Sequence, residues 1–332
     1  MATQLKPPSQ GLLDRTGPAD AGFISGWAFD VYWKDLQPTP DKLVLDVIHE
    51  QLKQARMRGN KSLKIRLRCA QWTPPWVLDA AGRFKLLLKD SPTSPPQEVT
   101  VGKWWTRPYK DAYQHLLNLL AQQHHCDDEP LIRSVVASMC TALSYPETYL
   151  RHTGDSPENG QRLLDAGFSV PADLDAHIFQ AMAHKRAFQH TRCSIAFNPY
   201  QAVQPDGTTR QDLCTTLEQL THLRQLLGDQ LIIENYSLRD QGTSHDPLSA
   251  DYEALWHAMK NAGPPIGFQT AATKEKLGDP VTVMRLADSL GANHVELLVG
   301  YESMDGMDWA HWNTVFQHNP TGAWEEQQPS WV

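Results

Sequence analysis

The sequence predicts a (β/α)8 barrel, and three observations lead to this fold class. Short segments rich in β-branched and aromatic residues alternate with amphipathic helical segments along the 332 residues, which indicates a mostly parallel sheet with right-handed crossovers. No GxGxxG or GxxxxGKS/T loop follows any of these segments, which disfavours a doubly wound nucleotide-binding sheet. Polar and aromatic residues follow nearly every strand, as expected where all strand ends meet on one face of a barrel.

Seven strands can be placed from their apolar, β-branched character. They are 27–33, 63–69, 132–139, 193–197, 230–233, 266–268 and 294–299, and the later ones are separated by predicted helices at 109–123, 174–188, 213–227, 252–261 and 280–290. The eighth strand is expected within residues 4–13, which are short and interrupted by prolines, so the barrel should be irregular there. We predict one domain over residues 1–332, with an insertion over the active face around residues 89–102.

Composition excludes several classes of protein. The chain is 41% hydrophobic and 20% charged, an ordinary globular balance, and its formal charge of −8 without a compensating basic patch disfavours a nucleic-acid partner. The N-terminus has no basic region followed by an apolar one, and no run approaches the roughly 18 apolar residues of a membrane span. Five scattered cysteines without a CxxC suit a reducing compartment. We therefore predict a cytoplasmic protein without a membrane partner, while the oligomeric state stays open.

No cofactor or metal is predicted. The cluster His124-His125-Cys126 resembles a metal site by composition, but it lacks zinc-site spacing and falls in a helix-to-strand loop, on the face opposite the active one.

One stretch, residues 26–77, carries a more specific pattern. A Trp–x–x–Leu–Gln–Pro turn beginning at Trp33 is followed by a helix and by a strand that closes with Pro–x–Trp at Trp76. This stretch resembles the first half of a (β/α)8 glycoside hydrolase of the β-galactosidase-like kind. The resemblance implies cleavage of a glycosidic bond in an oligosaccharide, polysaccharide or glycoconjugate. It also implies an acid/base glutamate after the following strand, at Glu147, although such enzymes usually place Asn before it and here Pro146 stands there.

Hydrolysis of a glycosidic bond needs two carboxyl groups, so glutamates at strand ends are the catalytic candidates. Glu147 is the predicted proton donor. Glu296 lies within a buried apolar strand, where a charge is costly unless it is paired or functional, and it is the predicted nucleophile or base. Glu234 has the same setting on an earlier strand and ranks third. An alternative is that Glu296 is only held by a buried arginine, such as Arg66 or Arg68, without a chemical role.

The position of one glutamine leaves the mechanism open. If the strand 27–33 is the second of the barrel, Gln269 ends the seventh, where the resemblance places the nucleophile of retaining enzymes. A retaining and an inverting mechanism therefore both stay open.

Eleven tryptophans and several uncharged polar residues at strand ends favour a cleft for a neutral sugar, because indole faces stack on sugar rings. The residues predicted to bind substrate are Asp30, Trp33, Arg66, Arg68, Trp72, Trp76, Asn198, Tyr200, Asn235, Tyr236, Gln269 and Tyr301. Two other functions stay open. One is a non-catalytic carbohydrate-binding barrel, and the other is a barrel lyase or isomerase.

Overall fold

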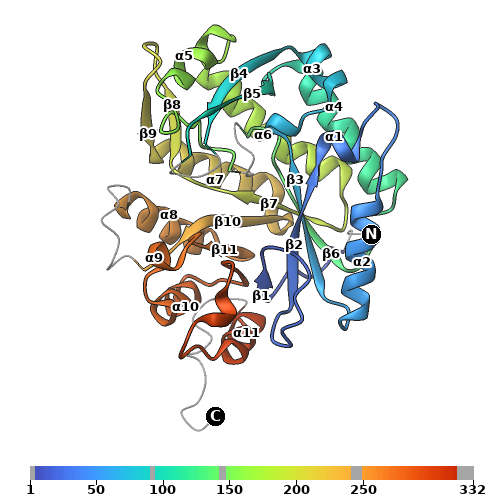
Figure 1. Ribbon diagram of the computed structural model, residues 1–332, viewed down its shortest axis with the longest axis vertical. Helices are drawn as coiled ribbons and strands as arrows, with labels where there is room; N and C mark the ends of the chain where they lie inside the picture. Colours follow the sequence, from blue (N-terminus) through green and yellow to red (C-terminus); the bar gives the residue numbers. More distant parts are fainter. Residues whose placement is uncertain (1–3, 90–93, 142–146, 241–248, 320–332) are drawn as a thin grey trace.

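The predicted (β/α)8 barrel is confirmed. The computed structural model describes residues 4–89, 94–141, 147–240 and 249–319. Its eight parallel strands form a closed barrel in the order β1-β12-β11-β10-β7-β6-β3-β2 (Figure 1). They are β1 Gly11–Asp14, β2 Gly26–Tyr32, β3 Ser62–Arg68, β6 Ile132–Val136, β7 Arg192–Ala196, β10 Leu231–Leu238, β11 Ile266–Thr270 and β12 His294–Leu297. The strand expected within residues 4–13 begins only at Gly11.

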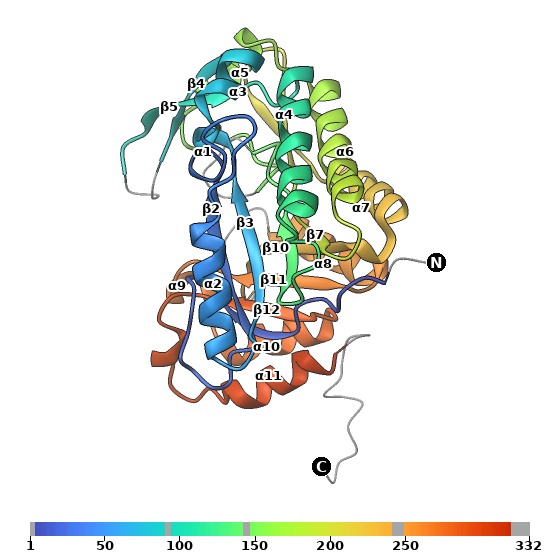
Figure 2. The same ribbon diagram turned by 90° about the vertical axis from the view of Figure 1, so that its right-hand side faces the viewer.

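Helices cover the outside of the barrel. The longer ones are α2 Asp46–Met57, α4 Arg107–Asn118, α6 Val170–Ala187, α7 Leu213–Leu227, α8 Ser249–Ala262, α10 Pro280–Ser289 and α11 Trp309–Gln317. Figure 2 shows α4 and α6 as neighbours, with α2 beside β2 and β3. The short ones are α1 Trp33–Leu36, α3 Pro75–Ala81, α5 Glu158–Asp165 and α9 Lys274–Leu277. In α2, the buried Ile48, Leu52 and Ala55 recur at helical spacing and bury one face against the sheet.

Two antiparallel hairpins follow the carboxyl ends of barrel strands. β4 Arg83–Leu88 pairs with β5 Gln97–Gly102 after β3, and β8 Tyr200–Val203 pairs with β9 Thr209–Asp212 after β7. Of the insertion predicted at residues 89–102, the last six residues therefore form β5, and residues 90–93 lie outside the described part of the chain.

The junction between β1 and β2 leaves an opening in the barrel wall. Only two residue pairs join these strands, the last being Asp14 with Trp27, which is the smallest number at any junction of the barrel. Within the described ranges, β2 then continues along β3 to Tyr32 with no strand paired on its other side beyond Trp27. β1 is short because the Asp14 carboxylate accepts hydrogen bonds from the backbone N–H (2.7 Å) and hydroxyl (2.6 Å) of Thr16, which turns the chain away.

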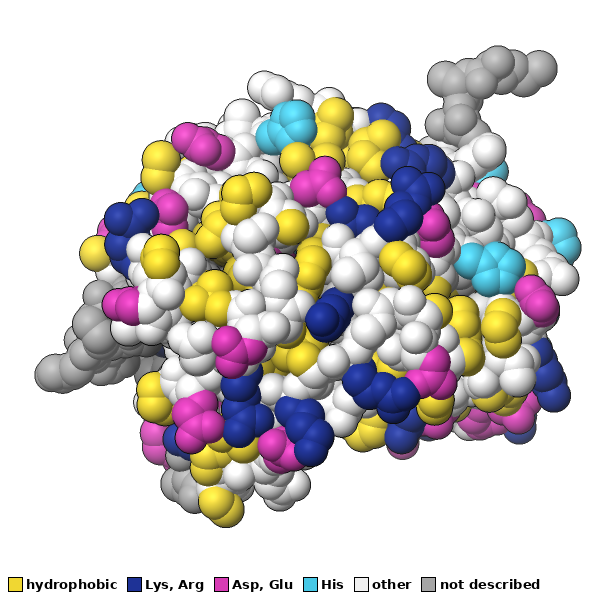
Figure 3. Space-filling model, turned by 90° about the horizontal axis from the view of Figure 1, so that it is seen from above, with side chains coloured by type: hydrophobic (Ala, Val, Ile, Leu, Met, Phe, Trp, Pro, Cys, Tyr) yellow, Lys and Arg dark blue, Asp and Glu magenta, His cyan; other side chains and the backbone are white. Residues whose placement is uncertain are grey.

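Among the described residues, no helix is both long and apolar enough to cross a membrane. On the face seen in Figure 3, lysine and arginine side chains are interspersed with aspartate and glutamate.

Candidate active site

Charged side chains fill the interior of the barrel. Successive residues of a strand point to opposite sides, so Leu63, Ile65 and Leu67 of β3 pack outward while the intervening Lys64, Arg66 and Arg68 point inward. The three inward side chains are almost completely buried. An isolated buried charge is very costly, so each of them requires a partner of opposite charge.

Lys64 and Arg66 both bind Glu296. The Lys64 ammonium donates to Oε1 of Glu296 at 2.6 Å and to Oε2 of Glu234 at 2.5 Å, and all three side chains are 0% exposed. Arg66 donates to the other oxygen of Glu296 and, at 3.1 Å, to Oε1 of Gln269. Both oxygens of Glu296 are therefore bound by cations, which is the arrangement expected if a buried basic side chain holds this glutamate.

The pKa values of both buried glutamates follow from these contacts. Burial alone would raise the pKa of Glu234, but the charge of Lys64 and a contact of 3.2 Å with His294 hold it below the usual range. The pKa of Glu296 is likewise lowered, because Arg66 and Lys64 outweigh the effect of burial. The hydroxyl of Tyr236 donates a further hydrogen bond of 2.8 Å to Glu234. Both glutamates are thus stable as carboxylates.

The same cluster contains potential metal ligands. Within the described parts of the chain, Glu234, His294 and Glu296 are the only group of three potential metal ligands, with their ligand atoms within 4.8 Å of one another. The ammonium of Lys64 contacts both carboxylates, so a side chain already supplies the positive charge there. The donor set therefore does not fit a metal ion unless Lys64 moves away.

Near the carboxyl end of β3, Arg68 interacts with two further acids, Asp30 and Glu147. It donates to Oδ2 of Asp30 at 2.6 Å, and the side chain of Asp30 is 29% exposed. Glu147, on the loop after β6, is partly buried. Burial raises the pKa of Glu147 to about 7, and the charge of Arg68 opposes this shift. A carboxyl group with such a pKa can donate a proton near neutral pH.

A buried ion pair fixes the chain directly after Glu147. Arg151 donates hydrogen bonds to the backbone carbonyl groups of residues 148 and 150, at 2.6 and 2.7 Å. Its guanidinium is paired with Asp173 of α6, and both side chains are 0% exposed. Asp173 also accepts a bond of 2.8 Å from the hydroxyl of Tyr200. Residues 142–146, including Pro146, lie outside the described part of the chain.

A cavity of about 500 Å³ lies at the carboxyl ends of β1, β2, β3 and β11 and extends through the opening beside β2. Barrel enzymes place their active sites at this end. Its floor is polar and charged. The residues that line it are Arg15, Thr16, Ala28, Phe29, Asp30, Tyr32, Val47, Gln51, Arg66, Arg68, Gln269 and Val299.

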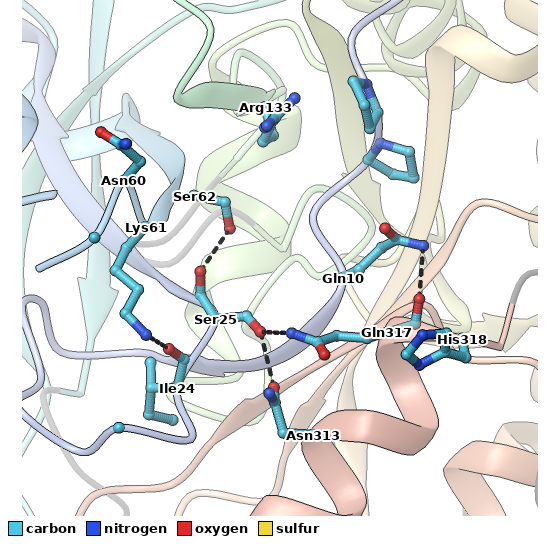
Figure 4. A pocket seen from close by; sticks show the side chains of 14 residues that line it. Gln10, Ile24, Ser25, Asn60, Lys61, Ser62, Arg133, Asn313, Gln317 and His318 are labelled. Carbon is cyan, nitrogen blue, oxygen red and sulfur yellow. Dashed lines mark hydrogen bonds between the residues drawn. The ribbon is translucent and has the colours of Figure 1, made fainter. Parts of the chain in front are cut away.

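A second cavity, of about 520 Å³, lies at the amino ends of β1, β2 and β3 (Figure 4). Its polar groups largely bind one another: the hydroxyl of Ser25 donates to Asn313 and accepts from Gln317, both at 2.8 Å. No acid is among the described residues that line it. Because this end of a barrel usually serves stability, the carboxyl-end cavity is the candidate active site.

Part of the predicted binding set comes together in the carboxyl-end cavity. Asp30, Arg66, Arg68 and Gln269 line it. The Trp72 ring lies 4.5 Å from that of Tyr32, another lining residue. Tyr236, with Glu234 and Glu296, lies in the buried charge cluster.

Two aromatic residues that were predicted to bind substrate, Trp33 and Trp76, do not line the cavity. Trp33 is 0% exposed, packs edge-on against Tyr109 and Tyr113, and donates its indole hydrogen bond to Gln37 at 2.8 Å. Trp76 packs against the same core and donates to the backbone of Gln37 at 3.2 Å. Trp33 begins α1 after β2, whereas Trp76 lies in α3 after β3. Both indoles pack against the hydrophobic core, and neither lines the cavity.

Four polar or aromatic strand-end residues that were predicted to bind substrate also lie outside the cavity lining. Asn235 points outward from β10, where its side chain accepts from the indole N–H of Trp256 at 2.9 Å and donates to a backbone carbonyl at 2.8 Å. The other three, which are fully or almost fully buried and away from the cavity lining, are Asn198, Tyr200 and Tyr301. Conversely, sequence reasoning missed Lys64, although the alternation of basic residues in KIRLR included it.

No protein-family model matches the sequence, and no curated protein matches it. Among solved structures, the chain is similar to a β-galactosidase from Rahnella sp. R3, with a TM-score of 0.56 and 12% identity over 96% of this chain and 57% of that one. It is also similar to the catalytic domain of a β-amylase from Paenibacillus polymyxa, with a TM-score of 0.57 and 8% identity over 88% and 93%. The chain thus spans just over half the length of the β-galactosidase. At these identities, what the three proteins share is the barrel fold.

Proposed function

We propose that the protein is a glycoside hydrolase and that Glu147 donates a proton to the leaving oxygen. The observation that carries the proposal is the setting of Glu147: a partly buried carboxyl group after the fourth barrel strand, beside Arg68, with a pKa raised to about 7. The position after the fourth strand agrees with the resemblance of residues 26–77. The fold shared with a β-galactosidase and a β-amylase supports the same reaction class.

Asp30 fits the role of the second carboxyl group better than Glu296. Asp30 lines the cavity, is partly exposed, and interacts with the same guanidinium as Glu147. Glu147 itself is not among the residues that line the cavity, so the pairing of the two acids rests on their common neighbour Arg68. The proposal requires a separation of roughly 5–10 Å between the two carboxyl groups. Glu296 is 0% exposed and both its oxygens bind cations, and Glu234 is equally buried. In this proposal Glu296 and Glu234 hold Arg66 and Lys64 in place.

Two substitutions separate these roles. Asp30→Asn should lower kcat of the folded protein by about 100-fold or more, because it removes a reacting carboxylate, and it should also lower Tm, because Arg68 loses an acidic partner. Glu296→Gln should mainly lower Tm, because it leaves Arg66 and Lys64 short of a negative charge. Asp35→Asn, an exposed aspartate on α1 outside the cavity lining, is the matched control and should change neither. Normal turnover in Asp30→Asn, together with lost turnover in a folded Glu296→Gln, would reverse the two assignments.

The proposed activity is tested with a panel of aryl glycosides and oligosaccharides, using a product assay that distinguishes the two anomers. Release of a reducing sugar by the wild type, with loss of that release from the oligosaccharides in Glu147→Gln, is the expected result. The anomer formed first also tells retention from inversion. If no member of the panel is cleaved while some of them raise Tm, the catalytic proposal fails.

The same experiment would then support a non-catalytic carbohydrate-binding barrel. One observation favours this second function: the seventh strand carries Gln269, which accepts from Arg66 at 3.1 Å, where the resemblance implies a glutamate. A glutamine can bind a sugar hydroxyl but does not act as the nucleophile.

A further inference from the structure

Exposed apolar side chains gather at the mouth of the carboxyl-end cavity. Among the described residues, the exposed large hydrophobic side chains are Tyr32 (36%), Val44 (37%), Val47 (51%), Met57 (62%) and Val299 (66%). Three of these, Tyr32, Val47 and Val299, line that single cavity. Single exposed apolar residues are ordinary on a protein surface, whereas several around one cavity mark a place where a ligand covers them.

These three side chains come from separate parts of the chain and lie around the opening beside β2. Tyr32 ends β2, Val47 lies in the first turn of α2, and Val299 follows β12, the strand that pairs with β1. The ring of Tyr32 rests on that of Trp72, and the ammonium of Lys34 lies 4.7 Å from the centre of the Trp72 ring. The Tyr32 part of the mouth therefore has packed side chains behind it.

The floor of the same cavity has the opposite character. Asp30, Arg66, Arg68 and Gln269 supply carboxylate, guanidinium and amide groups that suit the hydroxyl groups of a sugar. A longer oligosaccharide would place further hydroxyl groups against Val47 and Val299, where they lose water without gaining hydrogen bonds. An alkyl or aryl group at the mouth would instead cover these side chains.

We infer that the preferred substrate is a glycoside with an apolar aglycone, the sugar lying on the charged floor and the alkyl or aryl group at the mouth. This inference rests on the proposed function for the identity of the bond that is cleaved. It goes further than that function because it names the chemical class of the leaving group, an alkyl or aryl aglycone.

The test measures binding of methyl and n-hexyl β-D-glucoside and β-D-galactoside by calorimetry. A buried methylene tightens binding by about two- to fourfold, so for at least one of the two sugars the hexyl compound should bind at least tenfold more tightly than the methyl one. In the variant Val47→Ser/Val299→Ser that ratio should fall several-fold. Met57→Ser, which removes an equally exposed side chain at the other end of α2, should keep it.

Equal affinities of the hexyl and methyl compounds for both sugars, or no binding of either, would overturn the inference. An unchanged ratio in the double variant, or an equal loss in Met57→Ser, would do the same, because the hexyl group would then bind elsewhere. The two proposals fail separately. A hexyl preference without any hydrolysis contradicts the proposed function alone, and hydrolysis without a hexyl preference contradicts this inference alone.

Discussion

Replacing Lys64 by methionine is expected to lower the free energy of unfolding by about 3–5 kcal/mol at pH 7. The substitution keeps much of the side-chain volume but removes the ammonium that lies 2.5 and 2.6 Å from Glu234 and Glu296. Two completely buried carboxylates then share the remaining cation, Arg66, with only Glu296 in direct contact with it. Urea denaturation of the wild type and the variant measures the difference.

The loss should depend on pH in a defined direction. In the wild type the pKa values of Glu234 and Glu296 are lowered, so their ion pairs stabilise the fold above the ordinary glutamate pKa of 4.5, and this contribution is lost as the pH falls through the lowered values. In Lys64→Met the carboxyl groups can take up protons at mildly acidic pH. The difference between variant and wild type should therefore shrink between pH 7 and pH 4.

Lys53→Met is the control for the loss of a lysine as such. Lys53 is 67% exposed and lies 3.8 Å from Glu50, so its replacement should change stability by less than about 0.5 kcal/mol. Adding Glu234→Gln to Lys64→Met should recover part of the stability, because one unpaired charge disappears. If Lys64→Met were as stable as the wild type at pH 7, the buried charges would not need the lysine.

Glu147→Gln is expected to lower kcat by about 10²- to 10⁴-fold on a methyl glycoside. The loss on a 4-nitrophenyl glycoside of the same sugar should be much smaller, because a nitrophenolate leaves without needing a proton. The wild type should also lose activity as the pH rises past about 7, where Glu147 ionises, and this part of the pH profile should be absent in the variant. Steady-state rates on the two substrates between pH 5 and pH 9 measure both effects.

The same substitution should stabilise the protein at alkaline pH. The pKa of Glu147 is raised from 4.5 to about 7, so ionisation costs the wild type stability as the pH rises through this interval, by about 1–3 kcal/mol once solvent screening is allowed for. Glutamine cannot ionise, so Glu147→Gln should be more stable than the wild type at pH 8 and equal to it near pH 4. Glu158→Gln, with a 64% exposed side chain, should show neither change. Equal loss on both glycosides, or a destabilised variant at pH 8, would contradict the role of Glu147.

The fold was largely predictable because the alternation of strands and helices is a local pattern. The helix expected at residues 213–227 has those bounds in the structure. The strand expected at residues 230–233 extends to Leu238 in the structure. The prediction ended it too early because residues 234–237 are polar, which is unusual for a buried strand. These polar side chains fit in a buried strand because each face of β10 supplies hydrogen-bond partners: Lys64 in the barrel interior and Trp256 on the helix side.

The site was less predictable, for two physical reasons. Glu234 and Asn235 are adjacent and equally buried, yet only Glu234 faces the barrel interior, and a strand buried on both faces gives no alternation from which to choose. The ion pairs of Lys64 join residues 170 and 232 positions apart, which no local pattern records. Similarly, Tyr32, Val47 and Val299 become neighbours of one cavity only when the barrel closes.

The short β1 also affects the mechanics of the barrel. The β1–β2 junction has only two residue pairs, so it is the weakest strand pairing of the barrel. Local opening should require the least free energy there. The cavity mouth lies at this β1–β2 junction, with Val299 on the side of β12 and Val47 on the side of β2. A ligand that touches both side chains links the two edges. Ligand binding would then stabilise the closed barrel against local opening between β1 and β2.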